Sequence, residues 1–326
     1  MPTTHREVCA LLFAFVACSP AGTPSTRWPE RAVRIVVPSP PGTSTDLAAR
    51  LLAPQLARRW KQPVVVDNRP SGDGVAGVAA FVAEADEHAL LFAPLGVVTA
   101  NVLMHARLPF DAQRDLLPIA GPVSSSIGIA VARGISVLSL AELVRLARKS
   151  PGRLRFAGSP GLPDLMIRTL IAKEHLAMTR VSYREIPQAV RDLSDGRIEV
   201  LAVALPTMKA ALDAGMIRLI AVNASTRLAS EPGVPTVAES GWPDLTVDSP
   251  QGLFADRRAD AVLRTRIAAD VSEAVMDAGV ATRLAQLGFS VHASTPEAFA
   301  AAIARQKRQL EVMTRISARN DVGAQR

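Results

Sequence analysis

A run of hydroxyl-bearing residues lies where an expected strand gives way to an expected helix. The stretch IVVPSPPGTSTDLAARLL, residues 35 to 52, passes from an apolar run through prolines into a helical pattern. Because proline has no N–H, the free main-chain donors begin at Gly42 and end at Asp46, at the positive end of the helix dipole. The hydroxyls beside them belong to Ser39, Thr43, Ser44 and Thr45. This junction suits a carboxylate or another small anion, although a helix capped by Thr45 alone would have the same residues.

A second junction repeats this plan further along the chain. The stretch FAGSPGLPDLMIRTLI, residues 156 to 171, predicts a strand, then a loop with Ser159 and Gly161, then a helix that opens near Pro163 and Asp164. Two helix starts of this kind that face one cleft could hold two carboxylates of one small molecule.

Sequence motifs that are typical of enzymes provide little support for a catalytic function. GDGVAG, residues 72 to 77, matches a dinucleotide fingerprint, but no acidic residue follows the next expected strand, ALLFA, to bind a ribose. We therefore interpret GDGVAG as a helix start that glycine permits. The motifs of nucleophile elbows, zinc proteases and P-loops do not occur, and the five histidines have no metal-ligand spacing. No metal or cofactor is expected.

These junctions need strands and helices in alternation to position them. We expect strands at 33–37, 63–67, 89–93, 127–132, 153–157, 180–183, 198–203, 218–222 and 251–255. We expect helices at 46–60, 75–85, 139–149, 164–176, 187–194, 206–213, 261–278 and 295–318. Continuous apolar strands that alternate with helices predict an α/β fold with parallel sheets.

The order of these elements predicts two lobes. We expect residues 126–134 and 247–256 to be strands that cross a hinge, with 135–246 in one lobe and 28–125 plus 257–326 in the other. The C-terminal helices would then return to the first lobe. Ligands of α/β proteins bind at the carboxyl ends of strands, so a cleft between the lobes is the expected site.

Composition excludes several classes of function. The chain has 326 residues and a net charge of +7, but its basic residues form no continuous stripe, and aromatic residues make up 4%. We therefore expect no nucleic-acid partner.

The N-terminus has the pattern of an export signal. One arginine precedes an apolar run from Val8 to Ala17, and small residues follow it. We expect a signal peptide over residues 1–21 and a periplasmic protein, although Cys18 also resembles a lipid-attachment site. Cleavage after Ala21 would remove both cysteines.

Several stretches between Trp28 and about Asn320 follow one another in an order typical of a known family. They include WPERAVRIVVPSPPGTSTDLAARLLAPQLARRWKQPVVVDNRPSGDG, ARLPFDAQRDLLPIA, AVRDLSDGRIEVLAVALPTM, PGVPTVAESGWPDLTV and QGLFA. In these stretches the chain resembles the substrate-binding receptors of tripartite tricarboxylate transporters, also called the Bug family. The resemblance implies a two-lobed periplasmic-binding-protein fold of type II that closes on a small carboxylate. In the first lobe it implies ligand contacts at Gly42, Thr43, Ser44, Thr45 and Asp46. Elsewhere in the cleft it implies contacts at Leu95, Gly96, Ser159, Gly161, Tyr183 and Gln251.

The chain also departs from the pattern of the family in the predicted cleft. Arg184 and Glu185 stand where the family usually has lysine and glycine, and Ala204 replaces a customary acidic residue. The loop after Pro41 has fewer glycines than usual, and the second-lobe loop is shortened around Pro160. If Glu185 points inward, it would repel a second ligand carboxylate. Altered ligand preference or lost binding would follow from these departures.

The predicted function is a receptor with no chemical step. It would be a monomer, bind a small organic acid and present its closed form to the membrane subunits of a transporter. One alternative is a receptor that presents its ligand to the outer domain of a sensor protein. Another is a hydrolase, which would need a nucleophile beside a base in the cleft.

Overall fold

The computed structural model describes residues 28–70, 73–105 and 107–321, with side chains to residue 315. The predicted signal peptide, Cys18 and the cleavage site lie outside these residues. Within them, no helix is long and apolar enough to cross a membrane.

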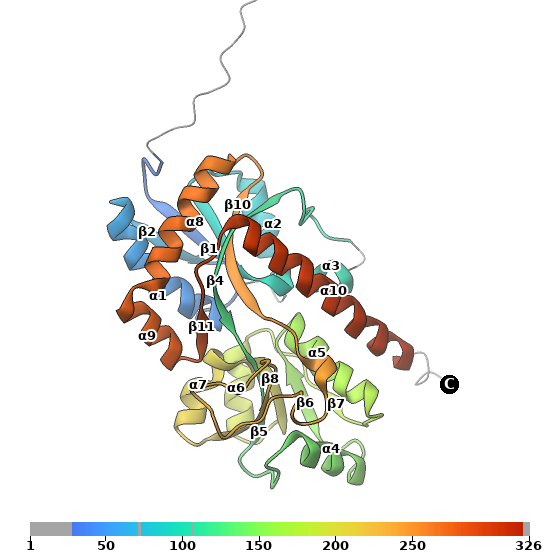
Figure 1. Ribbon diagram of the computed structural model, residues 1–326. Coiled ribbons are helices and arrows are strands. Elements are labelled where there is room, and N and C mark those ends of the chain that lie inside the picture. The colour runs from blue at the N-terminus through green and yellow to red at the C-terminus, as the bar shows by residue number, and fades with distance from the viewer. Residues whose placement is uncertain (1–27, 71–72, 106, 322–326) are drawn as a thin grey trace, which may run out of the picture.

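Two mixed sheets form the two lobes (Figure 1). The first sheet has the order β11-β4-β10-β3-β1-β2 and the second the order β7-β6-β8-β5-β9. The strands of the first sheet are β1 (Val33–Val37), β2 (Val64–Asn68), β3 (Ala89–Pro94), β4 (Leu116–Ser125), β10 (Pro250–Asp256) and β11 (Phe289–Val291). Those of the second are β5 (Ile127–Ala132), β6 (Arg155–Gly158), β7 (Thr179–Arg180), β8 (Val200–Ala204) and β9 (Ile217–Val222). The expected two-lobed α/β fold is confirmed. The sheets are not parallel as expected, because β10 runs antiparallel to β3 and β4, and β5 runs antiparallel to β8 and β9.

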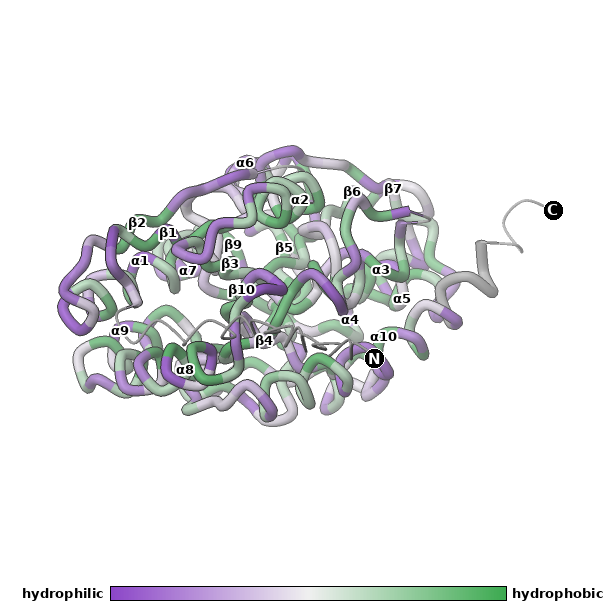
Figure 2. Tube along the Cα trace, turned by 90° about the horizontal axis from the view of Figure 1, so that it is seen from above, coloured by the Kyte–Doolittle hydropathy of each residue, from purple (hydrophilic) through white to green (hydrophobic). Residues whose placement is uncertain are grey.

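Helices cover both sheets. They are α1 (Ser44–Trp60), α2 (Val75–Glu84), α3 (Ala100–Met104), α4 (Leu140–Lys149), α5 (Leu162–Lys173), α6 (Ile186–Ser194), α7 (Leu205–Asp213), α8 (Ala261–Met276), α9 (Ala278–Gln286) and α10 (Pro296–Asp321), with 3₁₀ turns at Leu95–Val97 and Pro243–Leu245. Helices α8 and α10 carry both hydrophobic and hydrophilic segments, as helices with one buried face do (Figure 2). Apolar side chains from strands and helices form the buried clusters of each lobe.

The chain passes between the sheets at two places. β4 ends at Ser125 and β5 begins at Ile127, so the first passage is Ser126 alone. The second passage leads into β10, which pairs only with β3 and β4 in the first sheet, and it leaves the second lobe after Val247, the last residue before β10 in the buried cluster of that lobe. Neither β5 nor β10 is therefore shared between the sheets. The exact boundaries of the lobes stay a prediction.

Four elements were not expected: β4, β11, α3 and α9. The sequence of β4 contains Pro118, Gly121 and Pro122, which normally argue against a strand. The pairing of β4 with β10 tolerates them because its register shifts on either side of Leu253.

Helix α10 reaches further than expected. Its Phe299 is buried against the first sheet, where it packs beside Phe254 with ring centroids 5.2 Å apart. Its Leu310 and Met313 belong to the buried cluster of the second lobe, where α10 packs against α5 (Figure 1). Between these ends, Gln306 accepts a hydrogen bond from Thr99 Oγ1 at 2.6 Å and donates to the main-chain oxygen of Asp248 at 2.6 Å. The helix therefore joins both lobes, and not the first alone.

Candidate functional site

A cleft of about 100 Å³ lies between the lobes, at the carboxyl ends of β1, β3 and β8. Eight of the predicted contact residues line it: Thr43, Ser44, Thr45, Gly96, Ser159, Gly161, Ala204 and Gln251. Among the described residues of its lining there is no lysine, arginine or histidine. Any anion in the cleft must therefore be held by main-chain N–H groups, hydroxyls and amides.

The first turn of α1 supplies donors to the cleft. The helix begins at Ser44, with Thr43 as N-cap, so the alternative with Thr45 as N-cap is wrong. The Thr43 side chain makes no capping hydrogen bond. Within the described chain, the N–H groups of Thr45 and Asp46 have no acceptor. They are the unpaired donors that a helix N-terminus offers to an anion.

Asp46 holds this turn in place instead of lining the cleft. Its side chain is 2% exposed. One carboxylate oxygen accepts from the N–H of Gly42 at 2.9 Å, and the other accepts from Arg50 Nε and Asn68 Nδ2, each at 2.9 Å. Asn68 Nδ2 also donates to the main-chain oxygen of Ser39. Asp46 thus ties both ends of the loop to the end of β2.

Gly42 supports the same turn through its backbone conformation. Its φ is +81°, a value that favours glycine, and its N–H is directed to Asp46. It does not belong to the cleft lining.

Two more helices start at the cleft. Helix α5 begins after Gly161, and its Leu162 N–H lies 3.7 Å from the position of a Cβ on Gly96, on the opposite lobe. Helix α7 begins after Ala204. The sequence predicted anion sites at the starts of α1 and α5. At α7 it predicted only Ala204 as a residue of the cleft.

Thr207 was missed, and it joins the lobes. Its Oγ1 accepts a hydrogen bond from the Ser44 N–H at 3.0 Å, so the second lobe occupies a donor at the start of α1. The signal in the sequence was Pro206, which fits the first turn of a helix, so that a hydroxyl after it lies near the helix start.

The remaining predicted residues lie elsewhere. Leu95 is buried in the core of the first lobe. The Tyr183 hydroxyl donates to Asp192 at 2.9 Å, and burial together with this hydrogen bond raises the pKa of Tyr183 to about 12. Arg184 and Glu185 are exposed just before α6, outside the cleft lining. The structure therefore gives no support to repulsion of a ligand by Glu185.

The cleft hydrogen bond of Thr207 leads to a prediction. Thr207→Val removes the acceptor of the Ser44 N–H and keeps the volume, so the arrangement in which the lobes meet at the cleft should lose about 1 kcal/mol of stability. X-ray scattering of the unliganded protein should then report a larger radius of gyration. Thr207→Ser keeps the hydroxyl and should behave as the wild type. Equal radii for the two variants would contradict this role.

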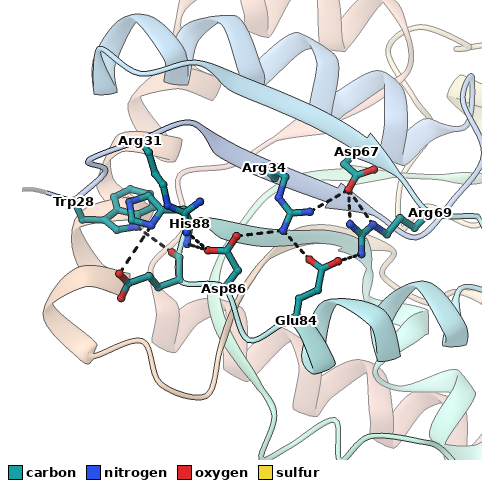
Figure 3. Close-up of polar contacts among 9 residues, drawn as sticks. Trp28, Arg31, Arg34, Asp67, Arg69, Glu84, Asp86 and His88 are labelled. Carbon is teal, nitrogen blue, oxygen red and sulfur yellow. Dashed lines mark hydrogen bonds and ion pairs between the residues drawn. The ribbon is translucent and has the colours of Figure 1, made fainter.

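A larger hollow of about 750 Å³ lies at the other end of the first sheet, where β1 and β3 begin. Beside it, acidic and basic side chains pair with each other (Figure 3). Asp86 accepts hydrogen bonds from Arg31 at 2.6 Å and Arg34 at 3.2 Å, and from the main-chain N–H of His88. Because α/β ligands bind at the carboxyl ends of strands, this hollow is not the candidate site.

Asp86 makes the stability of this region depend on pH. Burial opposes the charged form, but its hydrogen bonds to Arg31, His88 and Arg34 prevail and lower the pKa of Asp86 to about 2. A lowered pKa in the folded state stabilises the fold above the unfolded value, and this stabilisation is lost as pH falls toward 2. Asp86→Asn should cost about 1–2 kcal/mol at pH 7, after allowance for solvent screening.

Denaturant unfolding measured from pH 7 to pH 2.5 checks this prediction. The difference between Asp86→Asn and wild type should narrow below pH 4. Asp213→Asn is the control, because its side chain is 61% exposed and should contribute little at any pH. A difference that stays constant across this range would contradict the assignment.

Comparison with known proteins places the chain in a family. The family model described as "Tripartite tricarboxylate transporter family receptor" matches residues 48–317. The chain belongs to this receptor family. The resemblance found in the sequence is confirmed.

Relatives of this receptor match it over most of their length. BugT of Bordetella pertussis is 28% identical over 302 residues, which cover 89% of this chain and 91% of BugT. A protein from the tcbD-tcbE intergenic region of Pseudomonas sp. strain P51 is 29% identical over 302 residues, which cover 91% of this chain and 89% of that protein.

Solved structures of similar proteins include two with bound acids. Rpa4515 of R. palustris, solved with adipate, has a TM-score of 0.85 at 25% identity, with 89% of this chain and 98% of that chain covered. MatC of Rhodopseudomonas palustris, solved with bound malate, has a TM-score of 0.82 at 25% identity. The match covers 88% of this chain and 100% of MatC. This receptor therefore shares the fold of proteins whose structures hold small carboxylates.

Proposed function

We propose that this receptor captures a small carboxylate-containing ligand in the cleft between its lobes, without a chemical step. One observation carries the proposal: α1, α5 and α7 all begin at a cleft whose described lining contains no cationic side chain. The positive ends of helix dipoles favour anions, each by about 0.3–1 kcal/mol at an exposed site and more where water is excluded. Three such ends can together replace a basic residue.

The size of the cleft and the relatives support the same ligand class. A cavity of about 100 Å³ has room for several water molecules or a small organic acid. The similar structures with adipate and malate hold acids of this size. The proposed contacts are the N–H groups of Thr45 and Asp46 and the start of α5 at Gly161, together with the hydroxyls of Ser44, Thr45 and Ser159, with Gln251 behind them.

Capture is proposed to end in delivery to a membrane protein. Closure of the lobes around a ligand changes the surface that a partner meets, and family membership favours the membrane subunits of a tripartite transporter as partners. This role places the protein in the periplasm. Presentation to a sensor would use the same closed form, and uptake of a labelled acid by cells with and without the gene separates the two.

A titration experiment tests the proposal. The purified protein is titrated calorimetrically with succinate and adipate, with the monoamide of each, which keeps one carboxylate, and with the diamide of each as an uncharged control of similar shape. At least one acid should bind, and its diamide should bind at least about tenfold more weakly because the helix ends attract charge. Equal affinity for acid and diamide, or no binding of any acid, would refute it.

A further inference from the structure

The cleft contains one ionisable side chain among the described residues of its lining, and that side chain is acidic. Asp73 comes from the loop between β2 and α2, in the GDGVAG stretch that resembled a dinucleotide motif. An anionic ligand must therefore share the cleft with a carboxylate of the protein. This charge balance restricts the second functional group of a ligand.

The carboxylate of Asp73 is fixed in position. One oxygen accepts from the N–H of Val75 at 3.2 Å, so it occupies the start of α2, and the other contacts Nε2 of His105. Buried Asn101 donates from Nδ2 to the main-chain oxygen of Asp73 at 3.0 Å. The cleft thus has a further helix start, and there the protein supplies its own carboxylate.

Gln251 gives a second, independent observation. Its side chain is 1% exposed and lines the cleft. Its Nε2 donates to the hydroxyls of Ser44 at 3.0 Å and Ser125 at 2.8 Å, whereas its Oε1 has no donor among the described residues. Buried oxygens normally have a donor. A ligand group that carries N–H or O–H would supply one.

We propose that Asp73 is a specificity-determining residue, which replaces the second carboxylate of a diacid. The preferred ligand then has one carboxylate, held by the starts of α1, α5 and α7, and a hydrogen-bond donor at its other end. Ammonium, amide and hydroxyl groups meet this requirement. A second carboxylate would add a like charge to the cleft that Asp73 lines, and the two negative charges would repel each other. The inference rests on the proposed function and narrows its ligand class.

Matched pairs of acids test this inference. Succinate, glutarate and adipate are each compared with their own monoamide, which has the same length and one charge fewer. Calorimetric titration at pH 7.5 gives the ratio of the two affinities for each pair. The wild type should bind the preferred monoamide at least about tenfold more tightly than its diacid, as expected for repulsion between close charges.

Two variants of Asp73 and one control variant test whether Asp73 causes the preference for the monoamide. Asp73→Asn keeps an oxygen for the Val75 N–H, and Asp73→Ser is a second variant with a smaller polar side chain. Each should shift the ratio toward the diacid by about tenfold or more. Glu185→Gln removes an exposed carboxylate outside the cleft lining and should leave the ratio unchanged.

The outcomes separate this inference from the proposed function. A wild type that binds diacids as tightly as monoamides, with no change in the Asp73 variants, would overturn the role of Asp73 and leave carboxylate capture intact. If wild type and variants bind none of the six acids, carboxylate capture fails, and this inference fails with it.

Discussion

Asp46→Ala should weaken the binding of any acid that the cleft accepts by about a hundredfold, equivalent to about 2.7 kcal/mol. The carboxylate does not line the cleft, but it receives hydrogen bonds from the Gly42 N–H and from Asn68 Nδ2. Without it, the Gly42 N–H loses its acceptor and Asn68 Nδ2 keeps only the main-chain oxygen of Ser39, which together cost up to about 3 kcal/mol. The loop would move to find other partners and would misplace the free N–H groups of α1. The free energy of unfolding should fall by about 3 kcal/mol.

A neighbouring substitution provides the control for this prediction. Arg50→Ala removes another partner of Asp46, but its side chain is 52% exposed and the bonds to Gly42 and Asn68 remain. Its cost should stay below about 1 kcal/mol, as for other exposed ion pairs. Calorimetry for affinity and denaturant unfolding for stability measure both variants. If Asp46→Ala and Arg50→Ala lost equal affinity and equal stability, Asp46 would act through Arg50 and would not hold the loop.

Phe299→Ala should have the largest effect on stability, a loss of about 3–5 kcal/mol. The ring is 1% exposed and fills space that two glycines leave open. A Cβ built on Gly121 would lie 2.6 Å from the ring, and one on Gly252 would lie 2.2 Å from it. The substitution leaves a cavity where α10 contacts the first sheet.

A double-mutant cycle with Gly121→Ala isolates this contact. In the wild type the three atoms nearest to the added methyl group all belong to Phe299, so Gly121→Ala should be destabilising. The same substitution should cost much less in the Phe299→Ala background, where the ring is absent. Val312→Ala, on the same helix but 54% exposed, is the control for the helix itself. Additive effects of the Gly121 and Phe299 substitutions would contradict the proposed fit between ring and glycines.

The sequence predicted the regular elements better than the irregular ones. The bounds of β1 were predicted as found, because Val33 and the apolar run from Ile35 to Val37 flank a single arginine, and Pro38 ends the run. In contrast, β4 was missed, since its proline and glycine residues are accommodated only by its neighbours in the sheet. Helix α9 was missed because α8 stops at Met276 and the chain turns at Asp277, whose side chain caps the new helix.

The sequence predicted those parts of the candidate site that depend on a single continuous segment of the chain. The donors after β1 follow from a strand, prolines and a helix in sequence, and the loop after β6 follows from the same pattern. Thr207 and Asp73 could not be found in this way, because their roles depend on groups distant in the chain, the N–H of Ser44 and the ring of His105. Tyr183 lies outside the cleft lining, where its hydroxyl donates to Asp192 on α6.

The reach of α10 sets the order in which the chain can complete its fold. Leu310 and Met313 close the buried cluster of the second lobe, although most residues of that cluster lie between 127 and 247. During synthesis from the N-terminus, the second lobe remains unfinished until the last helix emerges. Chaperones that act on the nascent chain would therefore meet exposed apolar surface on α5 until a late stage. In the finished protein, the contacts of α10 with both lobes should link their stabilities, so that loss of either contact weakens both.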